Sequence, residues 1–227
     1  MVLVGYWPLD EDTGSTASDY SGEGNDVDLT MVNPGAPGIF NNSSFHVDQG
    51  GYLSMPAGSF PVGDFSISYW FKAEEDPNSS SNDRHYHMDL RGDGNQTNSQ
   101  FAIFIDSSTS GNDSAEWNVW EEGNYLIQVN EKYPVGEWIH VVVTRQNGTY
   151  QLFIDSNSVS TASGPNNTLT NSSSSHRWFN FSKRNEYTAE GNFSEIRYYD
   201  HALTSSEVQY LYSVSRRGLH TSSKKSL

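Results

Sequence analysis

The 227-residue chain contains no cysteine, so it has no disulfide, no thiol nucleophile and no thiolate ligand for zinc or an iron–sulfur cluster. It has no run approaching the roughly 20 apolar residues of a membrane-spanning helix, and we expect no membrane insertion. The first residues lack the basic start and long apolar segment of a signal peptide, so we expect synthesis without one. A chain of this length buries enough surface to fold without a covalent or metal staple.

Basic residues are also scarce: 13 Lys and Arg stand against 28 Asp and Glu, which gives a net charge of −15. A surface this negative repels phosphate, so we expect no nucleic-acid partner. An acidic, lysine-poor body is typical of proteins from high-salt organisms, and the alternative is an ordinary acidic extracellular domain. We therefore expect a protein of a virion or extracellular surface, from a high-salt (haloarchaeal) host.

Short runs rich in Val, Ile, Tyr, Phe and Trp alternate with clusters of Gly, Asn, Asp and Ser along most of the chain. The clearest expected strands are residues 65–72, 101–106, 125–130, 138–144, 150–155 and 193–199. In the first of these, Phe65, Ile67, Tyr69 and Phe71 alternate with smaller or polar residues, as in a strand with one face on a core. Many such strands without a long helical stretch predict an all-β fold, a two-sheet antiparallel jelly-roll sandwich.

One short C-terminal helix is expected near the end of the chain. Residues 204–207, Thr-Ser-Ser-Glu, form a capping-box pattern, and Val208, Leu211 and Tyr212 follow at helical spacing. The predicted domain covers residues 1–213. Residues 214–227 are predicted to form a basic polar tail that is flexible or docks on a partner.

Five blocks follow one another along the chain: GYWPLDEDTGSTASDYSGEGNDVDL, FHVDQGGYLSMP, DFSISYWFKAE, GEWIHVVVTRQNGTYQLFIDSNSV and GNFSEIRYYDHALTSSEVQYLY. In order and approximate spacing, over roughly residues 3–213, they resemble the laminin-G-like family of concanavalin A-like lectin and glucanase jelly rolls. The resemblance implies a two-sheet sandwich in which the N- and C-terminal strands are adjacent. The chain departs from the family at Ser194, where an Asp commonly precedes the Glu.

The resemblance also implies a structural Ca²⁺ where the two ends of the chain meet. Residues 19–26, with Asp19 and Asn25, bring carboxylate, hydroxyl and carbonyl oxygens into a glycine-bearing loop, and oxygen is the ligand that Ca²⁺ requires. This loop is expected to lie against the last strand near Glu195, the third candidate ligand. The alternative is a capped turn, in which Asp19 bonds its own backbone and Glu195 pairs with an arginine.

Residues 83–91 alternate in polarity, so a strand here places His85, His87 and Arg91 on one face together with aspartates. One interpretation is a ligand- or metal-binding face, on which the two histidines and the arginine contact a glycan. The alternative is a solvated face, because polar alternation arises without any ligand.

Trp117 and Trp120 stand among acidic and amide residues, which is the setting in which sugars stack on aromatic rings. Two residues three apart in a strand point to opposite faces, so we expect one ring in the core and the other exposed. Both are candidate ligand contacts, with core packing as the alternative.

The chain lacks the E-x-D-x-x-E pattern of related glucanases and the G-x-S-x-G, Walker A and H-E-x-x-H motifs, so we expect no enzyme. The leading hypothesis is a non-catalytic binding or display module, a structural or adhesion protein. Its expected partners are host-surface glycans or other virion and surface proteins, and we expect a homo-oligomer. The alternatives are a purely structural decoration or fibre subunit without a ligand, and a divergent carbohydrate-active enzyme.

Overall fold

The computed structural model describes residues 2–39, 43–56, 58–76, 84–91, 99–106, 114–166, 169, 176–178, 180–181 and 184–216. Strands dominate this part of the chain, and their bounds are β1 Leu3–Trp7, β2 Thr16–Ala17, β3 Val27–Pro37, β4 Ser43–Met55, β5 Phe65–Ala73, β6 Arg84–Arg91, β7 Ser99–Asp106, β8 Ser114–Glu121, β9 Asn124–Lys132, β10 Trp138–Gln146, β11 Thr149–Ile154, β12 Asn157–Ser163, β13 His176–Trp178, β14 Asn180–Phe181, β15 Arg184–Thr188 and β16 Gly191–Tyr199. A single helix in the described residues, α1, spans Ser205–Arg216.

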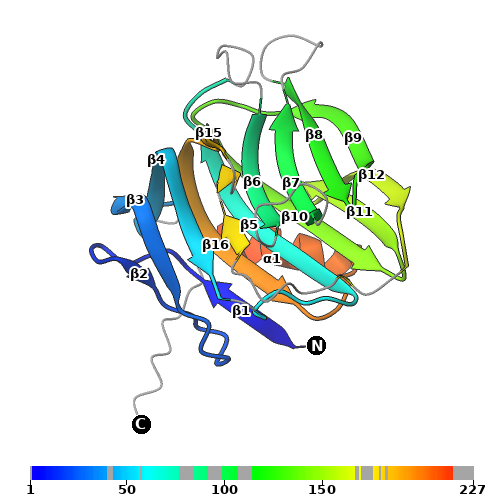
Figure 1. The fold of residues 1–227 in the computed structure, drawn as a ribbon, viewed down its shortest axis with the longest axis horizontal. Helices are drawn as coiled ribbons and strands as arrows, with labels where there is room; N and C mark the ends of the chain where they lie inside the picture. The colour runs from blue at the N-terminus through cyan, green and yellow to red at the C-terminus, as the bar shows by residue number, and fades with distance from the viewer. Residues whose placement is uncertain are drawn as a thin grey trace.

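The strands form two antiparallel sheets that pack face to face (Figure 1). The first, here called the helix-side sheet, has the order β12-β11-β10-β5-β16, and β1 pairs with the C-terminal half of β16. The second, the far sheet, contains β13-β6-β7-β8-β9, and β4 lies between β16 and β13. The pairing of β1 with β16 confirms that the N- and C-terminal strands are adjacent, and the two-sheet jelly-roll prediction is confirmed with it.

The core lies between the inner faces of the two sheets. The four alternating apolar residues predicted for β5 are all fully buried there: Phe65, Ile67, Tyr69 and Phe71. Phe65 meets Phe101 of β7 at 5.2 Å between ring centroids, edge to face, so the two sheets interdigitate. Each fully buried side chain of this size contributes about 1.5–3 kcal/mol relative to exposure.

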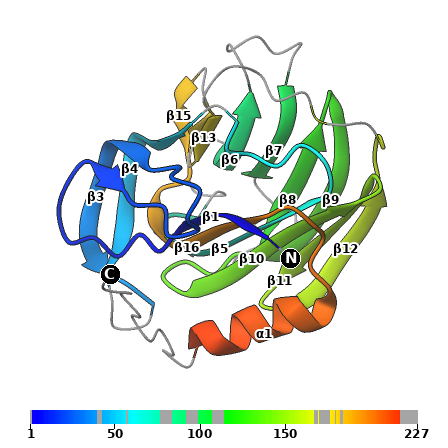
Figure 2. The ribbon, with the colours of Figure 1, turned by 90° about the horizontal axis from the view of Figure 1, so that it is seen from below.

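The predicted capping box begins α1. The Thr204 backbone N–H donates to Glu207 Oε2 at 2.7 Å, and the Glu207 N–H donates to Thr204 Oγ1 at 3.3 Å. Val208 and Leu211 pack against the outer face of the helix-side sheet. Figure 2 shows α1 on the outside of β10 and β11, away from β6 and β7.

The helix continues to Arg216, so the first residues of the expected tail are helical rather than irregular. Residues 217–227 lie outside the described residues. No helix in the described ranges has the length and apolar character needed to cross a membrane.

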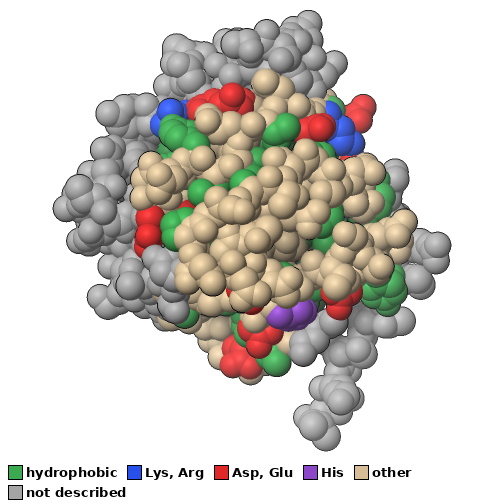
Figure 3. Space-filling view, turned by 90° about the vertical axis from the view of Figure 1, so that its right-hand side faces the viewer, with side chains coloured by type: hydrophobic (Ala, Val, Ile, Leu, Met, Phe, Trp, Pro, Cys, Tyr) green, Lys and Arg blue, Asp and Glu red, His purple; other side chains and the backbone are tan. Residues whose placement is uncertain are grey.

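Negative charge is unevenly distributed over the surface. Figure 3 looks at the side where β11 and β12 lie, and uncharged polar side chains and backbone dominate that face, with acidic side chains mainly around its margin. The composition of β12, Asn-Ser-Val-Ser-Thr-Ala-Ser, accounts for much of this neutral area.

Candidate functional site

Strand β6 places both of its histidines in the core. His85 is 5% exposed and His87 is fully buried. A β-bulge lies between Tyr86 and Met88, so His87 and Met88 both face inward and the simple alternation is broken. The prediction that His85 and His87 contact a ligand on a solvent face is therefore wrong. The side chain of Arg91, predicted to join them, lies outside the described residues.

Both rings are neutral imidazoles of the core. Burial lowers the pKa of His85 to about 4, although the negative charge of Asp76 acts to raise it. Burial, with a smaller effect of His85, holds the pKa of His87 well below its ordinary value. His87 Nδ1 lies 2.8 Å from the Tyr69 hydroxyl, and its ring packs 4.5 Å from Phe71. His85 Nδ1 and His87 Nε2 are buried without a hydrogen-bond partner among the described residues, so the core only partly satisfies these rings, which the sequence pattern alone did not reveal.

The two tryptophans of β8 point to opposite faces, as predicted. Trp117 is fully buried in the core and donates through Nε1 to the Lys132 carbonyl oxygen at 3.3 Å. Its predicted ligand contact is therefore wrong, because no part of the ring reaches the surface. Trp120 is half-buried on the outer face of the far sheet, where it packs against a small cluster that includes Phe104. It remains a candidate ligand contact.

An aromatic and polar surface surrounds Trp120. Tyr86 and Phe104 stack at 4.8 Å with an interplanar angle of 24°, and Phe104 meets Tyr125 edge to face at 5.9 Å. Tyr125 is 42% exposed and forms the outermost ring. The name β6–β9 face is used below for this region: Arg84, Asp106, Trp120 and Tyr125 reach the surface, and Tyr86, Phe104 and Asn118 lie buried beneath them.

Polar groups on the β6–β9 face are held in place by one another. Arg84 Nε donates to Asp106 Oδ1 at 2.9 Å, and Arg84 Nη2 donates to the Tyr125 hydroxyl at 3.2 Å. The guanidinium also lies over the Phe104 ring at 5.4 Å. Asn118 Nδ2 lies 3.5 Å from Asp106 Oδ2. Fixed donors and acceptors beside partly exposed rings can bind a polyol, because its hydroxyls need hydrogen bonds and its C–H surface needs an apolar contact.

The loop predicted to bind Ca²⁺ has the hydrogen bonds of a capped turn. Asp19 Oδ1 accepts from the backbone N–H groups of Tyr6 at 3.0 Å and Ser21 at 2.8 Å. Its Oδ2 accepts from the Ser21 hydroxyl at 2.8 Å and the Asn25 N–H at 2.9 Å. Despite partial desolvation, these four donors lower the pKa of Asp19. The Asn25 side-chain amide donates to the Val4 carbonyl oxygen at 3.3 Å, and the Asn25 backbone carbonyl oxygen accepts from Trp7 Nε1 at 2.8 Å.

Glu195 lies near this loop, as the family resemblance implied, because Tyr6 forms hydrogen bonds with both Asp19 and Glu195. The Tyr6 hydroxyl donates to Glu195 Oε2 at 3.1 Å, and Arg197 Nη2 pairs with the same oxygen. Within the described ranges, no group of three His, Asp or Glu side chains has the geometry to hold a metal ion. The donor set therefore does not fit Ca²⁺, and the calcium site stays a prediction.

Removing calcium is expected to leave the stability unchanged. A bound ion at one hundred times its Kd would add about 2.7 kcal/mol, an increase visible as a higher Tm. Because the oxygens of Asp19 and Glu195 are already bonded within the chain, thermal unfolding in EDTA and in millimolar Ca²⁺ should give the same Tm. A Tm that rises with Ca²⁺, but not with Mg²⁺, would restore the calcium site.

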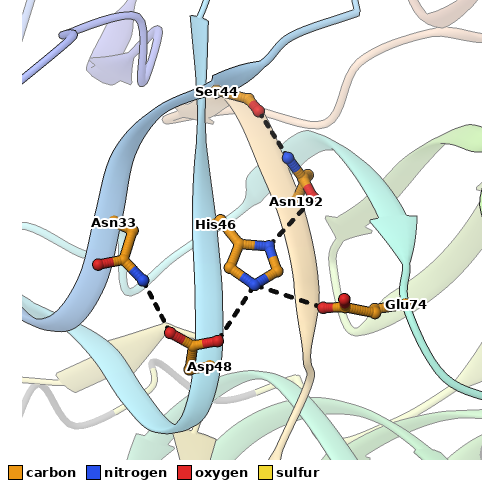
Figure 4. Close-up of polar contacts among 6 residues, drawn as sticks. All are labelled: Asn33, Ser44, His46, Asp48, Glu74 and Asn192. Atoms are coloured by element: carbon orange, nitrogen blue, oxygen red, sulfur yellow. Dashed lines mark hydrogen bonds and ion pairs between the residues drawn. The ribbon is translucent and has the colours of Figure 1, made fainter.

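A second polar cluster, which the sequence did not indicate, joins β4 to β5 and β16 (Figure 4). His46 Nε2 lies 3.2 Å from Asp48 Oδ1 and 3.3 Å from Glu74 Oε2, and Nδ1 lies 3.3 Å from Asn192 Oδ1. Asn192 Nδ2 in turn donates to the Ser44 hydroxyl at 3.0 Å. Both imidazole nitrogens face oxygen atoms of neighbouring side chains. Its members bond one another, and the cluster therefore links neighbouring strands.

These observations define a lectin-like jelly-roll domain with an aromatic and polar outer face. The family model described as the concanavalin A-like lectin/glucanases superfamily matches residues 47–209. The chain belongs to this superfamily. Comparison with curated protein sequences gives no match.

Solved structures with the same fold include both binding domains and enzymes. Domain 4 of AbnA, a GH43 extracellular arabinanase from Geobacillus stearothermophilus in complex with arabinotriose, is 19% identical with a TM-score of 0.68, over 93% of this chain and 98% of that one. The binding domain of Paraclostridial Mosquitocidal Protein 1 is 17% identical, TM-score 0.68, over 93% and 52%. A Trypanosoma rangeli sialidase mutant displaying trans-sialidase activity is 16% identical, TM-score 0.71, over 95% and 33%.

At these identities the likeness is one of fold. The chain spans about a third of the sialidase and about half of the toxin binding domain. Since one fold of this kind is found in enzymes and in non-catalytic domains, catalysis has to be argued from the side chains of this chain.

Proposed function

We propose that this domain is a non-catalytic carbohydrate-binding module and that the β6–β9 face holds the glycan. The observation that carries the proposal is the combination on one sheet surface of two partly exposed rings, Trp120 and Tyr125, with the bonded pair Arg84–Asp106. The rings offer apolar area for the C–H face of a sugar. The guanidinium and carboxylate, held at 2.9 Å from each other, offer donors and acceptors without further ordering of the side chains.

The structural neighbours support an oligosaccharide as the ligand class. One neighbour that matches along almost its whole length is described in complex with arabinotriose. Arabinotriose is therefore the first probe, followed by gluco-, xylo- and galacto-oligosaccharides and by glycans from haloarchaeal envelopes. The setting that we propose is a virion or other extracellular surface of a high-salt host, supported by the net charge of −15 and the scarcity of lysine.

Replacing Trp120 with Ala is expected to weaken oligosaccharide binding at least tenfold, because a sugar loses its stacking partner at the centre of the face. Calorimetry in molar salt with the oligosaccharide panel measures the change. Tyr20→Ala is the matched control, since Tyr20 is 56% exposed and lies at the Asp19 loop. It should bind like the unmodified protein.

Three results would overturn the proposal. If the Trp120→Ala variant binds the oligosaccharide as tightly as the unmodified protein, the site does not lie on the β6–β9 face. A folded protein that binds no oligosaccharide, and whose mass in solution is that of a stable oligomer, would favour a purely structural decoration or fibre subunit. Turnover of an oligosaccharide in the same experiments would favour a divergent carbohydrate-active enzyme.

A further inference from the structure

A groove lies on the opposite side of the molecule from the β6–β9 face, where the outer face of the helix-side sheet meets α1. Its volume is about 520 Å³, within the roughly 300–1,000 Å³ typical of small-molecule sites. Strands β5, β9 and β10, the helix and three connections contribute to its lining among the described residues. The aromatic and charged side chains that line it are Trp70, Lys132, Glu137, Trp138, Asp155 and Tyr212.

Aromatic rings form the inner surface of this groove. Trp70 of β5 and Tyr212 of α1 stack at 5.6 Å with an interplanar angle of 13°. Trp138 of β10 is half-buried, and the Lys72 ammonium lies over its ring at 5.7 Å. Tyr212 is also half-buried, so two rings of the groove keep surface in contact with solvent.

The helical wall of the groove is fixed before any ligand arrives. Val208 and Leu211, which precede Tyr212 on the same helix, pack against Val142 and Phe153 of the sheet. The capping box holds the first turn. Little conformational entropy is therefore lost when a ligand contacts Tyr212, which favours binding.

Three charged side chains line the groove, Lys132, Glu137 and Asp155, and Lys72 lies beside it over the Trp138 ring. Lys132 Nζ pairs with Asp155 Oδ2, while Asp155 Oδ1 accepts from the His140 backbone N–H at 2.8 Å, so this pair is held in a defined position. Glu137 is exposed on the rim, and Lys72 supplies the second ammonium. Two carboxylates and two ammonium groups leave no net charge, which disfavours a strongly anionic or cationic ligand.

We propose that this groove is a second saccharide site, which takes a neutral mono- or disaccharide unit. The rings provide an apolar contact for a sugar face, and the fixed carboxylate and ammonium of the Asp155–Lys132 pair bond its hydroxyls. The inference shares its ligand class with the proposed function but rests on different residues. Because the two sites lie on outer faces of opposite sheets, one domain could hold two separate glycan chains and gain avidity on a glycan-coated surface.

The experiment follows the indole N–H signals of Trp120 and Trp138 by NMR on the full chain. The probes are neutral aldoses, their disaccharides and arabinotriose at millimolar concentrations. At least one neutral saccharide is expected to shift the Trp138 signal saturably. Tyr212→Ala should weaken that response about tenfold, because one wall of the groove loses its ring. Tyr210→Ala is the control, since Tyr210 lies on the same helix, is 65% exposed and is not part of the groove.

The outcomes separate this inference from the proposed function. Saturable shifts at Trp120 alone would overturn the groove and keep the β6–β9 face. Shifts at Trp138 alone would keep the groove and overturn the face. No shift at either ring with any probe overturns both. Equal weakening by Tyr210→Ala and Tyr212→Ala would show that the helix, and not the groove, is responsible, and would count against the second site.

Discussion

Lowering the pH from 6.5 to about 4.5 is expected to remove about 8 kcal/mol of folding stability, because the fold buries three histidines in the neutral form. His85 and His87 lie in the core between the sheets, and His140 is fully buried under α1. Burial lowers the pKa of His140 to about 3 and that of His85 to about 4, and holds the pKa of His87 well below its ordinary value.

The direction of this pH effect follows from the pH at which the folded and the unfolded protein each take up protons. In the unfolded chain a histidine is protonated near pH 6.5, whereas in the folded protein burial lowers the pKa to about 4 for His85 and about 3 for His140 and holds that of His87 well below its ordinary value. Between these values the unfolded state binds more protons, so stability is complete above pH 6.5 and is lost as the pH falls. Each group contributes about 1.36 kcal/mol per pH unit, or about 4 kcal/mol per unit for the three.

Two carboxyl groups act in the opposite direction. Burial raises the pKa of Glu121 and of Glu190, so the folded state gains protons there as the pH falls toward 4.5. This reduces the slope without reversing it. A loss of this size is comparable with the roughly 5–15 kcal/mol of a whole domain, and we expect unfolding by acid near pH 4.5.

Urea denaturation at intervals from pH 7.5 to pH 5 measures the slope. His85→Gln should reduce it by about a third, whatever the variant's absolute stability, because one of the three titrating groups is gone. His201→Gln is the matched control, since His201 is only half-buried, at the surface beside Asp200. Stability that is flat with pH over this range would contradict the neutral burial of these histidines.

Replacing Arg197 with Met is expected to cost about 3–5 kcal/mol of stability, because it leaves the Glu195 carboxylate in the interior without its charge partner. Glu195 is 1% exposed and Arg197 is 7% exposed. The guanidinium pairs with Glu195 Oε2 and also lies 4.5 Å from the centre of the Tyr6 ring. Both residues of the pair belong to β16, and Tyr6 of β1 contacts each of them, so the substitution also weakens the contact between the first and last strands.

Arg84→Met is a matched control, since Arg84 forms an ion pair of similar geometry with Asp106 at the surface. Its side chain is 40% exposed, and surface pairs of this kind contribute about 0–1 kcal/mol. The double variant Arg197→Met/Glu195→Gln should recover part of the loss, because no buried charge remains. Urea unfolding with constant m-value reports all three. Equal losses for the Arg84 and Arg197 variants would contradict the buried-pair account.

Much of the fold was predictable from local sequence patterns. Strict alternation of apolar residues at 65, 67, 69 and 71 fixes a strand with one buried face, since successive side chains of a strand point to opposite sides. The capping box at 204–207 predicts the start of a helix, because its hydrogen bonds join residues three apart. The opposite orientation of Trp117 and Trp120 follows from the same two-residue period.

Site residues were less predictable, because their positions depend on irregular pairing and on distant partners. One extra residue in β6, near His87, turned two histidines and Met88 toward the same core, and a bulge has no dependable signature in a polar alternating run. Arg84, Asp106 and Tyr125 come together only through the register of three strands. The same is true of the His46 cluster, in which the bonded residues Ser44 and Asn192 are 148 residues apart.

By itself, the sequence determined the class of the protein: an acidic, cysteine-free, all-β sandwich with a capped C-terminal helix, recognisable from blocks that are local in the chain. Only the tertiary structure decided which of its polar and aromatic residues are core and which are surface. The physical reason is that burial is a property of what packs on a residue from elsewhere. The groove shows this most clearly, since Trp70, Trp138 and Tyr212 become one surface only after α1 has packed on the sheet.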